Sequence, residues 1–94
     1  MSRPRKRRRL VRLPRAEIYK PAGIPLDSLQ RVNLLPEELE ALRLCDLECL
    51  SQLEAAERMG ISRSTFQRML DRARRQVTLA LVEHMALQIN EPEL

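Results

Sequence analysis

The sequence has almost no aromatic side chains: of its 94 residues one is Phe, one is Tyr and none is Trp. This scarcity argues against recognition of single-stranded nucleic acid by base stacking, and it favours the aliphatic core of a small helical bundle. No apolar run approaches the roughly 18 residues that span a bilayer, and the basic N-terminus leads into Leu-Pro rather than into an apolar signal region. We therefore expect a cytoplasmic protein with no membrane contact.

Residue types typical of catalytic and metal sites are also few. The chain has one histidine, His84, and two cysteines, Cys45 and Cys49. Cysteines four residues apart share the apolar side of a helix, where each acts as a small hydrophobic group, and a structural zinc site would need two further ligands. No nucleophile can be matched with a base and an orienting group, and no glycine-rich phosphate loop is present. The sequence predicts no metal, no cofactor and no enzymatic activity.

The most informative pattern lies between residues 50 and 75. Ser51 and Glu54 have the spacing of a capping box, which opens a helix. Gly60 ends that helix, because only glycine adopts the left-handed conformation there without steric cost. Ser62 is then placed to cap a second helix, in which no Pro or Gly occurs for more than twenty residues. These signals predict a helix-turn-helix, and that motif makes DNA the expected partner.

The second helix has two contrasting sides at about 100° per residue. Its apolar side is formed by Phe66, Met69, Leu70, Ala73, Val77 and Leu81. Its polar side is formed by Ser64, Arg68, Asp71 and Arg75, flanked by Thr65, Gln67 and Arg72. Arg and Gln can pair with the major-groove edges of guanine or adenine, and Ser or Thr can contact bases or phosphates. We therefore expect this helix, which begins at Arg63, to read double-stranded DNA in the major groove.

The distribution of charge supports the same interpretation. The whole chain has a net charge of +4, but residues 1–15 hold eight basic side chains and no acid, so the remainder sums to −4. Within that acidic remainder, Arg63–Arg75 carries five arginines against Asp71. Such a pattern orients a polyanion toward the second helix and the N-terminal arm. The phosphate contacts are predicted at Arg72 and Arg75 and, in the arm, at Arg3, Arg5, Lys6, Arg7, Arg8 and Arg9.

The chain divides by composition into four parts. Residues 1–15 are predicted to be a largely disordered basic arm, 16–34 an extended segment that its prolines keep from becoming helical, 35–90 the helix-turn-helix domain, and 91–94 a tail. A helix beginning at Pro36 is predicted to bury one stripe formed by Leu35, Leu39, Leu42, Cys45 and Cys49. Apolar and polar residues alternate weakly over residues 86–90, and this alternation predicts one short strand. The predicted fold class is all-α, a small helical bundle with a helix-turn-helix.

Four segments together resemble a small uncharacterised prokaryotic family of predicted DNA-binding proteins, the UPF0251 type. They are Arg-Pro-Arg-Lys-Arg-Arg-Arg at 3–9, Lys-Pro-Ala-Gly-Ile-Pro-Leu at 20–26, Glu-Leu-Glu-Ala-Leu-Arg-Leu at 38–44 and Glu-Ala-Ala-Glu-Arg-Met-Gly-Ile-Ser-Arg-Ser-Thr-Phe at 54–66. The resembling helix-turn-helix is similar to region four of sigma factors, whose second helix enters the major groove. The resemblance implies that DNA-facing roles fall on Arg63, Ser64, Thr65, Gln67 and Arg68.

The sequence leaves more than one function open. The first is a transcription regulator that acts as a homodimer, because one short recognition helix rarely provides tight specific binding. The second is a module resembling sigma region four that binds RNA polymerase or another basic partner through the acidic residues between Glu37 and Glu57. A non-specific, nucleoid-type DNA binder is a further alternative. The DNA target and any effector do not follow from the sequence.

Overall fold

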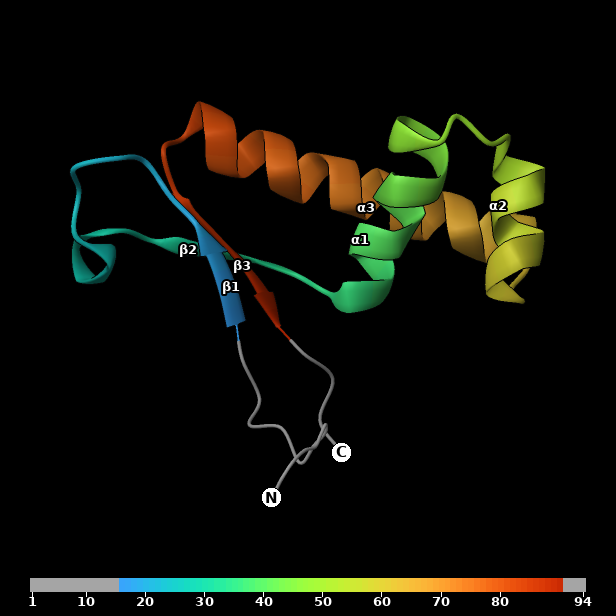
Figure 1. The fold of residues 1–94 in the computed structure, drawn as a ribbon, viewed down its shortest axis with the longest axis horizontal. Coiled ribbons are helices and arrows are strands. Elements are labelled where there is room, and N and C mark those ends of the chain that lie inside the picture. The colour runs from blue at the N-terminus through green and yellow to red at the C-terminus, as the bar shows by residue number, and fades with distance from the viewer. Residues whose placement is uncertain (1–15, 91–94) are drawn as a thin grey trace, which may run out of the picture.

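A three-stranded sheet and three α-helices make up the described part of the chain. The structure is a computed structural model that describes residues 16–90, and the predicted basic arm and tail lie outside these residues. The elements in chain order are β1 (Ala16–Tyr19), a 3-10 turn η1 (Leu26–Ser28), β2 (Arg31–Leu34), α1 (Pro36–Leu42), a π-helical turn η2 (Arg43–Leu47), α2 (Gln52–Met59), α3 (Arg63–Val82) and β3 (Ala86–Asn90). Figure 1 shows α3 running the length of the molecule, from α2 at one end toward the sheet at the other.

The sheet shows that the predicted all-α fold is wrong. Its strand order is β1-β3-β2, with β1 antiparallel and β2 parallel to the central strand β3. Tyr19 lies opposite Leu87 in the first pair, and Leu34 lies opposite Ile89 in the second. The short strand predicted at 86–90 is confirmed, but its partners come from the segment predicted to be only an extended lead-in. Extended backbone needs hydrogen-bonding partners, and here β3 provides them for both N-terminal strands.

A tight reversal after α3 directs β3 back into the sheet. His84 adopts the left-handed conformation with φ 55°, and the amide of Met85 donates to the carbonyl of Ala80 at 2.9 Å. This bond satisfies a carbonyl of the last helical turn in the manner of a Schellman cap. The amide of Ala86 then donates to the carbonyl of Gln30 at 2.9 Å, which begins the contact between β3 and the segment of β2.

The long helix α3 is buried along one side at both ends. At its N-terminal half the enclosed side chains form a cluster with α1, η2 and α2, comprising Ala41, Leu44, Ala55, Ala56, Phe66 and Leu70. Toward its C-terminus the buried residues include Ala80 on the helix and Val32, Leu34 and Ala86 on the strands. Because the helix is held over its whole length, the orientation of its N-terminal turns is set by tertiary packing as well as by the turn before it.

The apolar stripe predicted for the first helix is only partly right, because Leu42 and Cys45 pack against the core but its other three members are exposed. Leu35 and Leu39 are 39% and 40% exposed, whereas Glu38 and Ala41 are buried. The helix is rotated by about one residue because the carboxylate of Glu38 faces inward. The π-helical turn that follows ends at Leu47, so Cys49 lies beyond the helix and is exposed.

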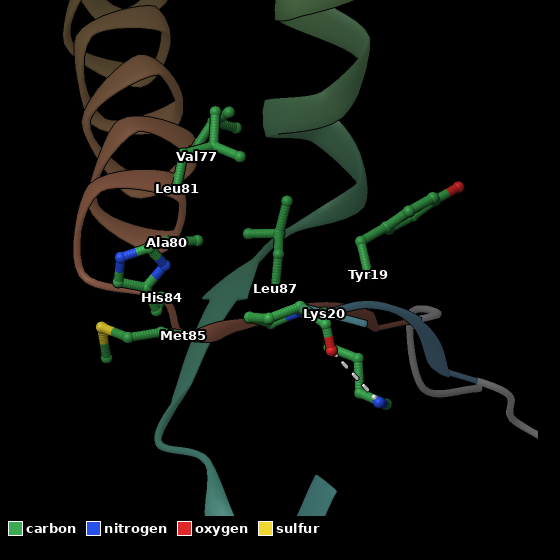
Figure 2. Close-up of a pocket in the computed structure, with 9 residues that line it drawn as sticks. Tyr19, Lys20, Val77, Ala80, Leu81, His84, Met85 and Leu87 are labelled. Carbon is green, nitrogen blue, oxygen red and sulfur yellow. Dashed lines mark hydrogen bonds between the residues drawn. The ribbon is translucent and has the colours of Figure 1, made fainter. Parts of the chain in front are cut away.

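One end of the core is incompletely filled. Leu81, predicted to face inward, is 73% exposed, and Ala80 beside it is buried instead. Leu81 lines an open, largely apolar pocket of about 300 Å³ with Val77 of the same helix and with Tyr19 and Leu87 of the sheet (Figure 2).

Candidate nucleic-acid interface

The turn between α2 and α3 has the predicted geometry. The hydroxyl of Ser51 accepts a hydrogen bond from the amide of Glu54 at 3.1 Å, and the carboxylate of Glu54 accepts one from the amide of Ser51 at 3.1 Å. Gly60 is left-handed, with φ 71° and ψ 30°. The amide of Gly60 donates to the carbonyl of Glu57 at 3.1 Å. The amide of Ile61 donates to the carbonyl of Ala56 at 3.1 Å. This pair of bonds is a Schellman motif, so the predicted capping box and glycine turn are both confirmed.

The start of α3 is capped as predicted, and the cap also restrains one of the residues assigned to DNA. The hydroxyl of Ser62 accepts from the amide of Thr65 at 3.1 Å and donates to the hydroxyl of Thr65 at 2.9 Å. Thr65 is half-buried, whereas Ser64 is exposed. Thr65 therefore stabilises the first turn of the helix and presents less of its side chain to a ligand than its neighbours do.

The first two turns of α3 leave a row of polar side chains uncovered. Phe66 and Leu70 are fully buried on one side of the helix. On the other side the exposed residues include Arg63, Ser64, Gln67 and Arg68. The predicted orientation of this helix is thus confirmed, and four of the five predicted DNA-facing residues lie together on an accessible surface.

Two of the five arginines on α3 are joined to other elements. Nη1 of Arg72, a predicted phosphate contact, donates to both carboxylate oxygens of Glu38, at 2.7 and 2.6 Å. The Glu38 side chain is 4% exposed and that of Arg72 is 50% exposed. The remaining oxygen contact of Glu38 is with the amide of Leu35, at 2.9 Å. This buried carboxylate joins α1 to α3, and sequence reasoning missed it because nothing in the helical period distinguishes it from neighbouring glutamates.

The second such arginine is Arg74, which donates to the two carboxylate oxygens of Asp46 at 3.1 and 2.7 Å. The hydrogen bond from Arg74 lowers the pKa of Asp46, and the same bond raises the pKa of Arg74. Both side chains are nearly half exposed, so the pair is a modest tether between η2 and α3. Arg63, Arg68 and Arg75 form no ion pair with any other residue in the range 16–90.

The acidic residues between Glu37 and Glu57 are largely engaged within the protein. Arg43 pairs with Glu40 at 2.7 Å and also with Glu48. The hydrogen bond from Arg43 lowers the pKa of Glu40. Five of the seven acids in this stretch therefore accept a hydrogen bond or form an ion pair within the protein. They are Glu38, Glu40, Asp46, Glu48 and Glu54.

The two cysteines have different surroundings. Cys45 is half-buried against the helical core, and this burial raises the pKa of its thiol. Cys49 is exposed and left-handed, with φ 63°, so the prediction that it is a core residue is wrong. Within residues 16–90 no three His, Cys, Asp or Glu side chains gather in a group that could hold a metal ion. The same part of the chain contains no helix with the length and apolarity needed to cross a membrane.

Comparison with known proteins gives a family. A family model described as "Protein of unknown function DUF134" matches residues 1–94. The chain belongs to this family. Among curated DUF134 relatives of the UPF0251 type, the chain is 51% identical over 89 residues to UPF0251 protein VV2_0946 of Vibrio vulnificus, covering 95% of this chain and 89% of that protein. The family named in the sequence resemblance is thus confirmed.

Other DUF134 relatives are longer than this chain. A UPF0251 protein of Desulforudis audaxviator is 55% identical over 89 residues, covering 95% of this chain and 58% of that protein. One from Halothermothrix orenii is 50% identical over 88 residues, covering 94% of this chain and 65% of that protein. The chain therefore spans less than two thirds of the length of these two relatives. No solved structure gives a significant match. None of these names states a ligand or an activity, so the geometry of the DUF134 chain is the guide to its chemistry.

The uncovered row on α3 has the chemistry and the dimensions of a groove-binding surface. An α-helix with its side chains is about 10 to 12 Å across, and the major groove of B-DNA is about 12 Å wide. Gln67 and Arg68 are long side chains with forked donors, placed one turn into the helix, and Arg63 stands at its first position. The positive charges of Arg63 and Arg68, with no acidic residue in the first turn of α3, and the short polar Ser64 suit contacts with bases and with the phosphates that border the groove.

Proposed function

We propose that this protein binds double-stranded DNA as a transcription regulator and reads its sequence in the major groove with the first two turns of α3. The observation that supports this proposal best is the uncovered row of Arg63, Ser64, Gln67 and Arg68 at the start of a helix that follows a Schellman turn. The turn and the caps are held by backbone and side-chain hydrogen bonds, so the row is preorganised for one orientation against a ligand. Helix-turn-helix proteins place the N-terminal residues of the second helix against base edges in this way.

The proposal assigns different roles along the helix. Gln67 and Arg68 contact base edges, because their side chains combine donors and reach. Arg75 lies two turns further on and is exposed, outside the row that contacts bases. Arg72 uses only Nη1 toward Glu38, so its other nitrogens are available for a phosphate while its orientation is set by the buried carboxylate.

The acidic surface gives less support to the alternative of an interaction module for a basic partner. Within the described residues only Glu37 and Glu57, of the seven acids in that stretch, have no hydrogen bond or ion pair through their side chains. The other five already accept from arginines or from backbone amides. A basic partner would have to compete with those contacts, whereas Arg63, Arg68 and Arg75, which have no ion pair among residues 16–90, face solvent without competition.

The proposal is tested by selecting bound sequences from a random duplex pool and then measuring the affinity of variants. Arg68→Ala should weaken binding to the selected site by about 1 to 3 kcal/mol, and should weaken binding to a scrambled duplex much less. Arg31→Ala is the matched control, because Arg31 is an exposed arginine on β2, where its side chain donates to Gln88 at 3.0 Å. The control should bind the selected site nearly as tightly as the wild type.

Three other results would revise the proposal. Equal losses on both duplexes would make Arg68 a phosphate contact. A wild-type protein that binds selected and scrambled duplexes with a ratio near one would be a non-specific, nucleoid-type binder. A wild-type protein that binds no duplex at low salt would refute DNA binding altogether, since electrostatic attachment is strongest there.

A further inference from the structure

The C-terminal half of α3 has an exposed apolar surface that the DNA-binding proposal does not use. Leu79 and Val82 are 38% and 63% exposed. At about 100° per residue they lie on one side of the helix, together with Arg75 and Glu83 and turned away from the buried Ala80. A shallow hollow of about 510 Å³ lies over this surface, lined by Arg74, Arg75, Thr78, Leu79, Val82 and Glu83. We call Arg75, Leu79, Val82 and Glu83 the distal face.

The charges of the distal face are symmetric about Leu79. Arg75 precedes Leu79 by four residues and Glu83 follows it by four, so a basic and an acidic side chain stand about 6 Å along the helix axis to either side. Both charged residues are exposed, and neither forms an ion pair with another residue of the described range 16–90. The face therefore has two opposite charges, unpaired within residues 16–90, on either side of a partly exposed leucine.

This arrangement is complementary to itself in one orientation only. A second copy that packs antiparallel, with Leu79 on the two-fold axis, places Arg75 opposite Glu83 of the partner subunit, and the symmetry repeats that pair at the other end. A parallel pairing would place arginine against arginine and glutamate against glutamate, which is repulsive at both ends. The charges therefore select the antiparallel orientation, and the two leucines bury each other at the centre.

We propose that the distal face of α3 is the contact surface of a homodimer in which two copies of this helix pack antiparallel through Leu79. The interface is isologous, so it closes at two subunits and leaves no further face for growth. Val82 flanks the central leucine and adds the second apolar contact. The N-terminal turns of each helix extend beyond the overlap and remain uncovered.

The dimer has a consequence for DNA, and this step rests on the proposed function. Gln67 precedes Leu79 by twelve residues, or about 18 Å along the helix. In the antiparallel pair the two copies of Gln67 are therefore about 36 Å apart along the helix direction, close to one turn of B-DNA. Selected binding sites should contain two inverted half-sites whose centres are one helical turn apart.

The interface is tested in the absence of DNA by sedimentation equilibrium of the full chain over a wide concentration range. Arg75→Glu and Glu83→Arg should each raise the dimer dissociation constant roughly tenfold or more, because each creates like charges at both ends of the pair. The double variant with both substitutions should dimerise nearly as well as the wild type, since the swap restores both attractions. All of these positions are exposed, so thermal unfolding should be little changed.

A second pair of variants tests the apolar centre. Leu79→Asp places two carboxylates on the two-fold axis and should leave the protein monomeric. Leu53→Asp is the matched control, because Leu53 is a 55% exposed leucine on α2, away from the distal face. The control should dimerise as the wild type does, and circular dichroism shows whether either variant has lost its fold.

The dimer proposal and the DNA proposal fail in different ways. A wild-type protein that stays monomeric at every concentration, or a dimer that is insensitive to both charge reversals, overturns the interface. If the wild-type protein is monomeric but still selects single half-sites, the interface is refuted and the DNA-binding proposal stands. If the charge swap restores dimerisation but the wild-type protein binds no duplex, the interface is supported and the proposed function is refuted.

Discussion

Removing the arginine that neutralises the buried carboxylate should be one of the most damaging single changes at the surface of this protein. Glu38 is 3% exposed, and its charge is balanced by Arg72, whose Nη1 lies 2.7 and 2.6 Å from its two oxygens. Arg72→Met keeps the length of the side chain and removes the charge. Among residues 16–90 the carboxylate then keeps only the bond from the amide of Leu35.

The expected cost is about 3 kcal/mol. Breaking a buried ion pair by removing one partner costs roughly 3 to 5 kcal/mol, because an uncompensated charge remains inside. The lower end applies here because the Arg72 side chain is 50% exposed, so water can reach part of the vacated site. That loss is a large fraction of the roughly 5 to 15 kcal/mol by which small domains are stable.

Urea unfolding followed by far-UV circular dichroism measures this cost. Arg68→Met is the matched control, since Arg68 is exposed on the same helix and has no ion pair within residues 16–90, and it should change stability by less than about 0.5 kcal/mol. The double variant Glu38→Leu with Arg72→Met should recover most of the lost stability, because an apolar pair can replace a buried ion pair at little cost. A loss below about 1 kcal/mol for Arg72→Met, with no coupling in the double-mutant cycle, would refute the structural role. Unchanged stability with weakened DNA binding would make Arg72 a phosphate contact only.

Three further predictions concern the turns and the acidic tether. Gly60→Val should destabilise the protein by about 1 to 3 kcal/mol through backbone strain alone, because Gly60 has φ 71° and an added Cβ would meet no atom within 4 Å. Gly60→Asn should cost much less stability in thermal unfolding. Equal losses for the two variants would argue against conformational strain. Cys49→Gly should raise stability by about 0.5 to 1 kcal/mol in the same assay, because an exposed non-glycine residue at φ 63° is strained, and a loss would show that the thiol makes a stabilising contact. Because Arg74 lowers the pKa of Asp46, the pair stabilises the fold above the unfolded pKa of about 3.9, and this contribution is lost as the pH falls through the lower folded value. Asp46→Asn should therefore reduce the acid sensitivity of the urea midpoint below about pH 4, and an unchanged pH profile would contradict the tether.

The parts of the site that the sequence predicted correctly depend on local hydrogen bonds. The capping box of Ser51 and Glu54 and the cap at Ser62 join groups three residues apart. The left-handed Gly60 is a property of one residue. The exposed side of the first turns of α3 follows from the helical period once the buried Phe66 is recognised. Each of these features could be predicted because its energy depends on neighbours along the chain.

The errors concern contacts between distant segments. The strand at 86–90 was predicted, but its partners at β1 and β2 lie more than fifty residues earlier, so the all-α fold class missed the sheet. The apolar stripe predicted for α1 was only partly right because Glu38 turns inward toward Arg72, 34 residues away. The same contact gives Arg72 a structural partner that its position on the polar side of the helix does not indicate.

The sequence by itself determined where α2 begins, where the chain turns and where α3 starts, because caps, a glycine turn and a helical period are short-range effects. Only the tertiary structure decided which of the charged residues are free to meet a ligand. Arg72 and Arg74 are held by carboxylates of α1 and η2, whereas Arg63, Arg68 and Arg75 have no ion pair among residues 16–90. The reason is physical: an ion pair depends on the distance between two side chains in space, and that distance is set by how α3 packs against the helices and the sheet.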